Sequence, residues 1–111
     1  MANAFKNAGL AATGTALTDA YTAGSGVTAT VIGLTCANIS STNPILVSIK
    51  FYDASANANF FVVKDAQIYT GGALVAVGGD QKLVLEAGDK IKVISNTAAS
   101  VDTIVSVMEQ S

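Results

Sequence analysis

The segment that decides the fold is Leu83-Val84-Leu85-Glu86-Ala87-Gly88-Asp89-Lys90-Ile91-Lys92-Val93, in which two alternating runs of apolar and polar residues flank a short turn. Successive side chains of a strand point to opposite faces, so Leu83 and Leu85 share one face of the first run. Ile91 and Val93 share one face of the second. Gly88 adopts positive φ at little cost, as a tight connection requires. The segment therefore predicts two half-buried strands joined as a β-hairpin.

The same pattern continues along most of the chain. From residue 16 onward, runs rich in Val, Ile, Thr, Phe and Tyr alternate with Gly, Asn, Ser and Asp clusters at intervals of about ten residues. The predicted strands cover residues 16–22, 27–39, 45–53, 58–64, 73–77, 82–86, 89–95 and 101–109, and no segment has a helical pattern. The sequence predicts an all-β protein, a single two-sheet antiparallel β-sandwich, jelly-roll-like, of about eight short strands. The strand order cannot be read, so sandwich, jelly roll and barrel stay open.

The length indicates one domain with a short extension. A chain of 111 residues builds one hydrophobic core. Residues 1–13 are small and weakly patterned, so we expect an N-terminal arm that is ordered only against a neighbour, followed by a β-sandwich domain over residues 14–111. The first residues lack the apolar core of a secretory signal, which indicates synthesis inside a cell. No apolar run approaches the ~20 residues that span a bilayer, so no membrane partner is expected.

The charge pattern argues against a nucleic-acid partner. Charged residues make up 13% of the chain, the net charge is −2, and all six basic residues are lysines scattered among eight acids. A protein that binds nucleic acid gathers Arg and Lys into a patch that neutralises several phosphates. With no Arg and no Trp, neither bidentate base contacts nor strong stacking platforms are expected.

The residues that usually carry catalysis are missing. The chain has no His, so an imidazole base is excluded, and the single Cys36 lies in an apolar run where a small buried hydrophobe is expected. Glu86 and Asp89 are the nearest pair of carboxylates, but their turn predicts two solvated side chains and no glycosidase pair. The segment 78–82 resembles a phosphate loop only superficially, because it precedes a strand. We expect no enzyme activity, no cofactor and no metal site.

Several strands are apolar on both faces, which predicts an interface with other subunits. In residues 27–34 the alternation places Val31 inward and both Ile32 and Leu34 on the reverse face. One small sandwich cannot cover both faces of such strands, so part of this surface is expected to meet another subunit. The predicted subunit-interface residues are Phe5, Leu46, Tyr52 and Met108.

A second hypothesis concerns the aromatic residues. Tyr52, Phe60, Phe61 and Tyr69 are the residues from which a sugar-binding platform could be built. Without Trp, such a set more often packs in cores and interfaces. A receptor- or carbohydrate-binding module therefore stays open as an alternative to a purely structural role.

Four stretches carry a resemblance to a known group of proteins: residues 1–8, 31–39, 62–66 and, most specifically, 77–89. They resemble small β-rich virion structural proteins of tailed bacteriophages, especially phages of cyanobacteria and marine bacteria. The resemblance implies a capsid decoration, or cement, protein without catalytic residues. Such a protein bridges major capsid protein subunits on the outside of the virion, stabilises the head, is often a homotrimer, and is made in the bacterial host cytoplasm. A neck, tail or head-fibre component is the alternative within the same group.

Overall fold

The structure is a computed structural model that describes residues 3–111, and within that range it contains nine β-strands and no helix. The strands are β1 (Asn3–Thr13), β2 (Thr18–Thr22), β3 (Thr28–Asn38), β4 (Ile45–Asp53), β5 (Ala58–Ile68), β6 (Ala73–Val77), β7 (Leu83–Leu85), β8 (Lys90–Ser95) and β9 (Val101–Gln110).

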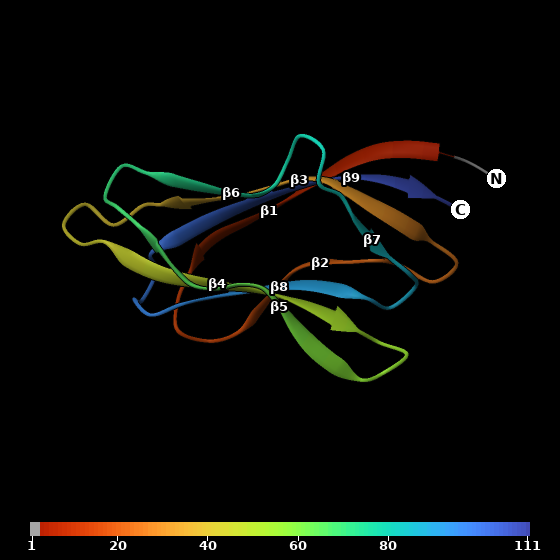
Figure 1. Ribbon diagram of the computed structural model, residues 1–111, viewed down its shortest axis with the longest axis horizontal. Coiled ribbons are helices and arrows are strands. Elements are labelled where there is room, and N and C mark those ends of the chain that lie inside the picture. Colours follow the sequence, from red (N-terminus) through yellow and green to blue (C-terminus); the bar gives the residue numbers. More distant parts are fainter. Residues whose placement is uncertain (1–2) are drawn as a thin grey trace.

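The strands form two antiparallel sheets that pack face to face (Figure 1). Sheet A has five strands, in the order β1-β9-β3-β6 with β7 also beside β3, and sheet B has four, in the order β2-β8-β4-β5. Consecutive strands thus alternate between the sheets at β1–β2 and β2–β3, as in a jelly roll. The predicted two-sheet β-sandwich is confirmed, and the jelly-roll order is the part that only the structure reveals.

The core lies between the two sheets and consists of alternate residues on their inner faces. The largest completely buried side chains are Leu34, Ile45, Ile49, Leu85, Ile91, Val31, Val47, Val77, Val93, Val101, Val105 and Val107. Leu34 is buried together with Val31, although simple alternation predicted opposite faces. The register of β3 against β9 shifts between Val31 and Gly33, and this bulge inserts one residue that turns Leu34 inward.

Residues 3–13, predicted as an arm outside the sandwich, form the edge strand β1 of sheet A. β1 pairs antiparallel with β9, from Asn3 opposite Gln110 to Leu10 opposite Thr103. The domain therefore begins within the predicted arm, and the expected boundary at residue 13 is not present. Small residues suffice at an edge strand that buries little side-chain area, which explains the weak pattern. Residues 1–2 of the predicted arm lie outside the described residues.

The segment 83–93 does not form the predicted hairpin. β7 pairs with β3 in sheet A, whereas β8 pairs with β2 and β4 in sheet B, so the turn between β7 and β8 carries the chain from one sheet to the other. Gly88 has φ 88°, as the turn prediction required. Alternation correctly identified both strands and their inward faces, but it holds no information about which strands pair.

The two ends of the described chain lie side by side. Because Asn3 is paired with Gln110, the first and last strands begin and end at the same end of a molecule that measures 47 × 26 × 22 Å (Figure 1). Both ends belong to sheet A.

Candidate interaction surfaces

The outer face of sheet A, hereafter the sheet A face, carries large apolar side chains in two rows that cross the strands. Directly paired residues of antiparallel strands lie on the same face of a sheet. The first row consists of Phe5, Met108, Thr30 and Val84. The second row consists of Gly9, Ile104, Thr35 and Val75. Phe5 is 76% exposed, Val75 65%, Val84 58% and Ile104 57%. Four large apolar side chains are therefore open to solvent on one face of the sheet.

The charge distribution makes the sheet A face easy to desolvate. All residues of the two rows are uncharged, and Asp102, opposite Ala37 on the neighbouring strand, lies on the same face two residues before Ile104. One oxygen of its carboxylate already accepts a hydrogen bond from the backbone N–H of Ala12, at 2.7 Å. Burying an uncharged surface carries little of the cost of removing ions from water. This uncharged apolar surface makes the sheet A face a candidate interaction site.

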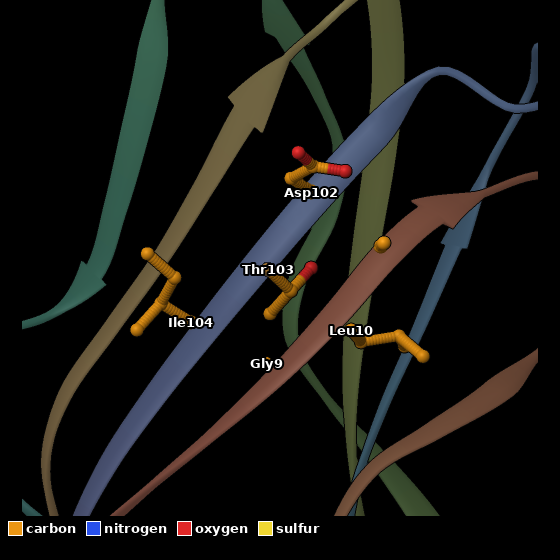
Figure 2. A pocket seen from close by; sticks show the side chains of 6 residues that line it. Gly9, Leu10, Asp102, Thr103 and Ile104 are labelled. Atoms are coloured by element: carbon orange, nitrogen blue, oxygen red, sulfur yellow. The ribbon is translucent and has the colours of Figure 1, made fainter.

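A shallow hollow of about 210 Å³ lies over β1 and β9 (Figure 2). It is lined by Gly9, Leu10, Ala11, Asp102, Thr103 and Ile104. Gly9 leaves open space there, because a Cβ atom added at this position would meet no heavy atom within 4 Å. The hollow is lined mainly by apolar atoms and offers no cluster of polar groups that would orient a small ligand.

The outer face of sheet B carries four of the six lysines. Lys50 and Lys92 are directly opposite each other, and Lys90 lies two pairs further along β8, opposite Tyr52. The Nζ atoms of Lys50 and Lys64 lie 4.8 and 5.4 Å from the ring centre of Phe61. Aromatic faces attract ammonium groups and so offset the repulsion between opposed lysines. The lysines looked scattered along the sequence, but the sheet brings them together.

Asp19 and Tyr52 are further partners of the lysines on the same face. The carboxylate of Asp19 lies 3.0 Å from Lys90 Nζ and 3.8 Å from Lys92 Nζ. Lys92 Nζ also lies 4.9 Å from the ring centre of Tyr52. Each lysine of this face therefore already contacts a carboxylate or an aromatic ring. A nucleic-acid-binding surface would instead present its lysines free to contact phosphates.

The four predicted interface residues divide between the two outer faces. Phe5 and Met108 are directly paired on the sheet A face. Leu46 and Tyr52 lie on β4 in sheet B, six residues apart on its outer side, and Tyr52 donates a hydrogen bond to Asn57 Oδ1 at 2.7 Å. They do not form one patch, and their contact with another subunit stays a prediction.

The aromatic residues do not form one platform. Phe60 stacks on Phe51 with 6.3 Å between ring centres, whereas its neighbour Phe61 points to the opposite face of β5. Tyr69 lies beyond the end of β5 and is 68% exposed. The side chains considered for sugar binding are therefore spread over both sides of sheet B.

The carboxylates of the turn between β7 and β8 have different surroundings. Glu86 is exposed, but Asp89 is only 3% exposed, so the prediction of two solvated carboxylates is wrong for Asp89. The two oxygens of Asp89 accept hydrogen bonds from the backbone N–H groups of Ala54 and Glu86, each at 2.9 Å. Asp89 thus holds the turn against the β4–β5 connection, and its oxygens are occupied by the backbone.

Cys36 is completely buried between the sheets, and its Sγ lies 3.5 Å from Thr103 Oγ1. Burial raises the pKa of its thiol and so suppresses the reactive thiolate. The predicted small buried hydrophobe is confirmed.

A polar cluster of Tyr21, Glu109 and Lys6 was not found from the sequence. The Tyr21 hydroxyl donates a hydrogen bond to one oxygen of Glu109, and Lys6 Nζ lies 3.1 Å from the other. These bonds lower the pKa of Glu109, while burial and the Glu109 carboxylate raise the pKa of Tyr21. The cluster connects β2 of sheet B to β9 and β1 of sheet A. No signal in the sequence joins residues so far apart.

Within residues 3–111, no group of three or more His, Cys, Asp and Glu residues is arranged to hold a metal ion. Over the same range the structure has no helix of the length and apolar character needed to cross a membrane.

No model of a known protein family matches this chain, and no curated protein matches it. Among solved structures, the fold is similar to that of a protein of the Bacillus endospore appendages, which form a family of disulfide-linked pili. The similarity has a TM-score of 0.50 at 14% sequence identity, and it covers 99% of this chain and 85% of that protein. At this identity the similarity establishes a shared fold.

Proposed function

We propose that this chain is a non-enzymatic structural protein that docks through the sheet A face, and that it serves as a decoration protein on the capsid of a tailed bacteriophage. The observation that carries the proposal is the uncharged sheet A face with Phe5, Ile104, Val75 and Val84 open to solvent. The resemblance of residues 77–89 to small phage virion proteins supports the placement on a capsid.

The physical basis of stabilisation is repeated burial of apolar surface. Each contact contributes about 25 cal/mol per Å² of apolar area before the cost of association is subtracted. A rigid sandwich that bridges two capsid subunits adds such a contact at every equivalent position of the shell. Many modest contacts then resist the outward pressure of packaged DNA.

The surroundings of the chemically active groups support a non-enzymatic role. The thiol of Cys36 is buried, and the carboxylate of Asp89 is saturated by backbone N–H groups. The hollow over Gly9 presents no set of convergent polar side chains.

The test uses capsids of the phage that encodes the chain, assembled without it. Purified protein is added, bound protein is measured after sedimentation, and DNA retention on heating is compared. Wild-type protein is expected to bind and to raise the temperature of DNA release. Ile104→Asp and Val75→Asp place a charge on the sheet A face and are expected to weaken binding at least tenfold.

Leu17→Asp is the matched control, because Leu17 is an exposed apolar residue that directly precedes β2 of the opposite sheet. It is expected to bind like the wild type. Equal binding of Ile104→Asp and wild type, or particles whose heat resistance does not change when the protein is added, would contradict the proposal.

A filament subunit is the second candidate, and the shared fold with a pilus protein favours it. Covalent linking through disulfides is not available in the same form here, because Cys36 is the single cysteine and is buried. Electron microscopy of the concentrated protein separates the two candidates: long fibres without capsids support a filament, and their absence favours decoration. A neck or tail component would instead assemble as a ring of higher order than the homotrimer implied by the resemblance.

A further inference from the structure

We infer that two copies of the chain pair through β1, antiparallel about a twofold axis at Asn7, with Phe5 of each copy covering Gly9 of the other. The inference rests on the proposed structural role and names the surface by which the chain recognises itself. It stands on the edges of the sheets, the sequence of β1 and the hollow over Gly9.

β1 offers the most regular sheet edge among residues 3–111, with Lys6 as its single charged residue. β2 has five residues and a register shift between Asp19 and Tyr21. β5 has two register shifts against β4, and Asp65 adopts φ 51°. β6 and β7 have five and three residues and are separated by a loop. Bulges and short strands prevent edge pairing, whereas β1 runs from Asn3 to Leu10 without a register shift.

The sequence of β1 is complementary to itself in one antiparallel register. With Asn7 opposite Asn7, Phe5 lies opposite Gly9, Lys6 opposite Ala8 and Ala4 opposite Leu10. Phe5 and Gly9 share the sheet A face, because their partners on β9 are Met108 and Ile104 of that face. The most exposed large apolar side chain among residues 3–111 thus falls opposite the residue without a side chain.

The hollow over Gly9 provides room for the Phe5 ring of the second copy (Figure 2). Its volume is about 210 Å³, and its lining includes the apolar side chains of Ala11 and Ile104 and the acidic Asp102. An aromatic side chain that covers a glycine on the neighbouring strand is a recognised way to stabilise an edge. In one copy alone, Phe5 stays 76% exposed and the hollow stays open.

The pairing brings no like charges together. Lys6 is the one charged residue of β1, and in this register it faces Ala8 of the second copy. Its ammonium group is already paired with Glu109 at 3.1 Å. The pair joins two copies of sheet A into one continuous sheet.

The contact is small, so the pair dissociates on dilution. Each Phe contributes about 150–250 Å² of buried area, and stable interfaces bury about 1,200–2,000 Å² in total. Two edge strands and two rings fall below that range. We therefore expect a dimer whose population rises with protein concentration.

The first test is the mass in solution, measured by sedimentation equilibrium over a wide range of concentration. The expected result is a shift from 11.2 kDa toward twice that mass. Gly9→Val fills the hollow and is expected to weaken the dimer at least tenfold. The variant keeps the fold, because a Cβ at Gly9 meets no atom within 4 Å and its φ is not positive. Phe5→Ala is expected to weaken the dimer similarly.

Val75→Ala is the matched control, because it removes an exposed apolar side chain of the same face from the opposite edge of sheet A. It is expected to dimerise like the wild type. The inference would be overturned if the protein had the mass of one chain at every concentration or formed a trimer. It would also be overturned if Gly9→Val left the dimer unaffected.

The second test fixes the register. Asn7→Cys places two thiols across the twofold axis, where opposed Cβ atoms are about 4.5–5.5 Å apart, and oxidation is expected to link the copies. Asn3→Cys is the control, because residue 3 faces Ala11 of the second copy. Equal linking of both variants would overturn the register.

Two variants distinguish this inference from the proposed function. Val75→Asp is expected to lose capsid binding and still form the dimer, whereas Gly9→Val is expected to lose the dimer and still bind the capsid.

Discussion

The hydroxyl of Tyr21 on β2 donates a hydrogen bond to Glu109 on β9, and this contact joins the edge of sheet B to sheet A. We predict that Tyr21→Phe lowers the melting temperature by a few degrees, because the ring stays packed while the link between the sheets is lost. Differential scanning calorimetry measures the change. Tyr69→Phe is the control, since Tyr69 is 68% exposed and should leave the melting temperature unchanged. Equal melting of all three proteins would contradict a stabilising link.

The same pair predicts how stability depends on pH. The pKa of Glu109 is lowered by its bonds to Tyr21 and Lys6, so its contribution is complete above about pH 4.3 and is lost as the pH falls through the folded pKa. The pKa of Tyr21 is raised by burial and by Glu109, so its contribution is complete below about pH 10 and is lost as the pH rises further.

Melting temperatures measured from acid to alkaline pH test both signs. We expect stability to fall at both ends, and we expect Tyr21→Phe to show a shallower alkaline decline. An alkaline decline of the same slope in wild type and Tyr21→Phe would show that Tyr21 does not carry it. Glu109→Gln is the corresponding variant at acid pH, and we expect its stability to decline less steeply than that of the wild type as the pH falls.

Removal of the Asp89 carboxylate is expected to destabilise the turn that joins the sheets. In Asp89→Ala, the backbone N–H groups of Ala54 and Glu86 lose their acceptors in a buried site. The expected loss is about 2–4 kcal/mol of unfolding free energy, measured by urea denaturation. Glu86→Ala changes the exposed acid of the same turn and should stay within about 0.5 kcal/mol of the wild type. Similar losses in both variants would argue against the role of Asp89.

Cys36 is expected to resist thiol reagents as long as the protein is folded. The thiol is buried beside Thr103 and its pKa is raised, so neither access nor thiolate is available. A chromogenic disulfide reagent should react after addition of denaturant and not before. Asn7→Cys, on the exposed edge strand, should react at once with a single equivalent. Rapid labelling of the folded wild type would show that the sheets separate locally.

Much of the fold could be predicted because short strands carry a period of two. β4 and β6 agree with their predicted ranges 45–53 and 73–77, and the inward residues Val47 and Ile49 follow from alternation. β1 was missed because an edge strand of Ala, Gly and Asn buries too little to show a pattern. The bulge at Ile32 was missed because an inserted residue leaves no trace in a list of apolar positions. The absence of pairing between β7 and β8 across the turn at Gly88 could not be predicted either, because each of these strands pairs with strands that are distant in the sequence.

The candidate surfaces were predicted in part. Phe5 and Met108 were each predicted as subunit-interface residues, but their pairing across β1 and β9 follows from the register alone. The gathering of Lys50, Lys64 and Lys92 on one face likewise requires the sheet, since neighbours across strands are far apart in sequence. The sequence shows the chemical character of each residue, whereas the strand pairing determines which residues become neighbours.

The side-by-side position of Asn3 and Gln110 determines how the molecule responds to mechanical force. Tension applied between the two ends acts across the β1–β9 ladder, perpendicular to the strands, and opens it one pair of hydrogen bonds at a time like a zipper. Force applied along the strands must instead shear many bonds together. A polymer in which each copy is linked through both chain ends would therefore come apart at low tension. A copy that is bound through the outer faces of its sheets transmits no force between its chain ends, so the β1–β9 ladder is not loaded.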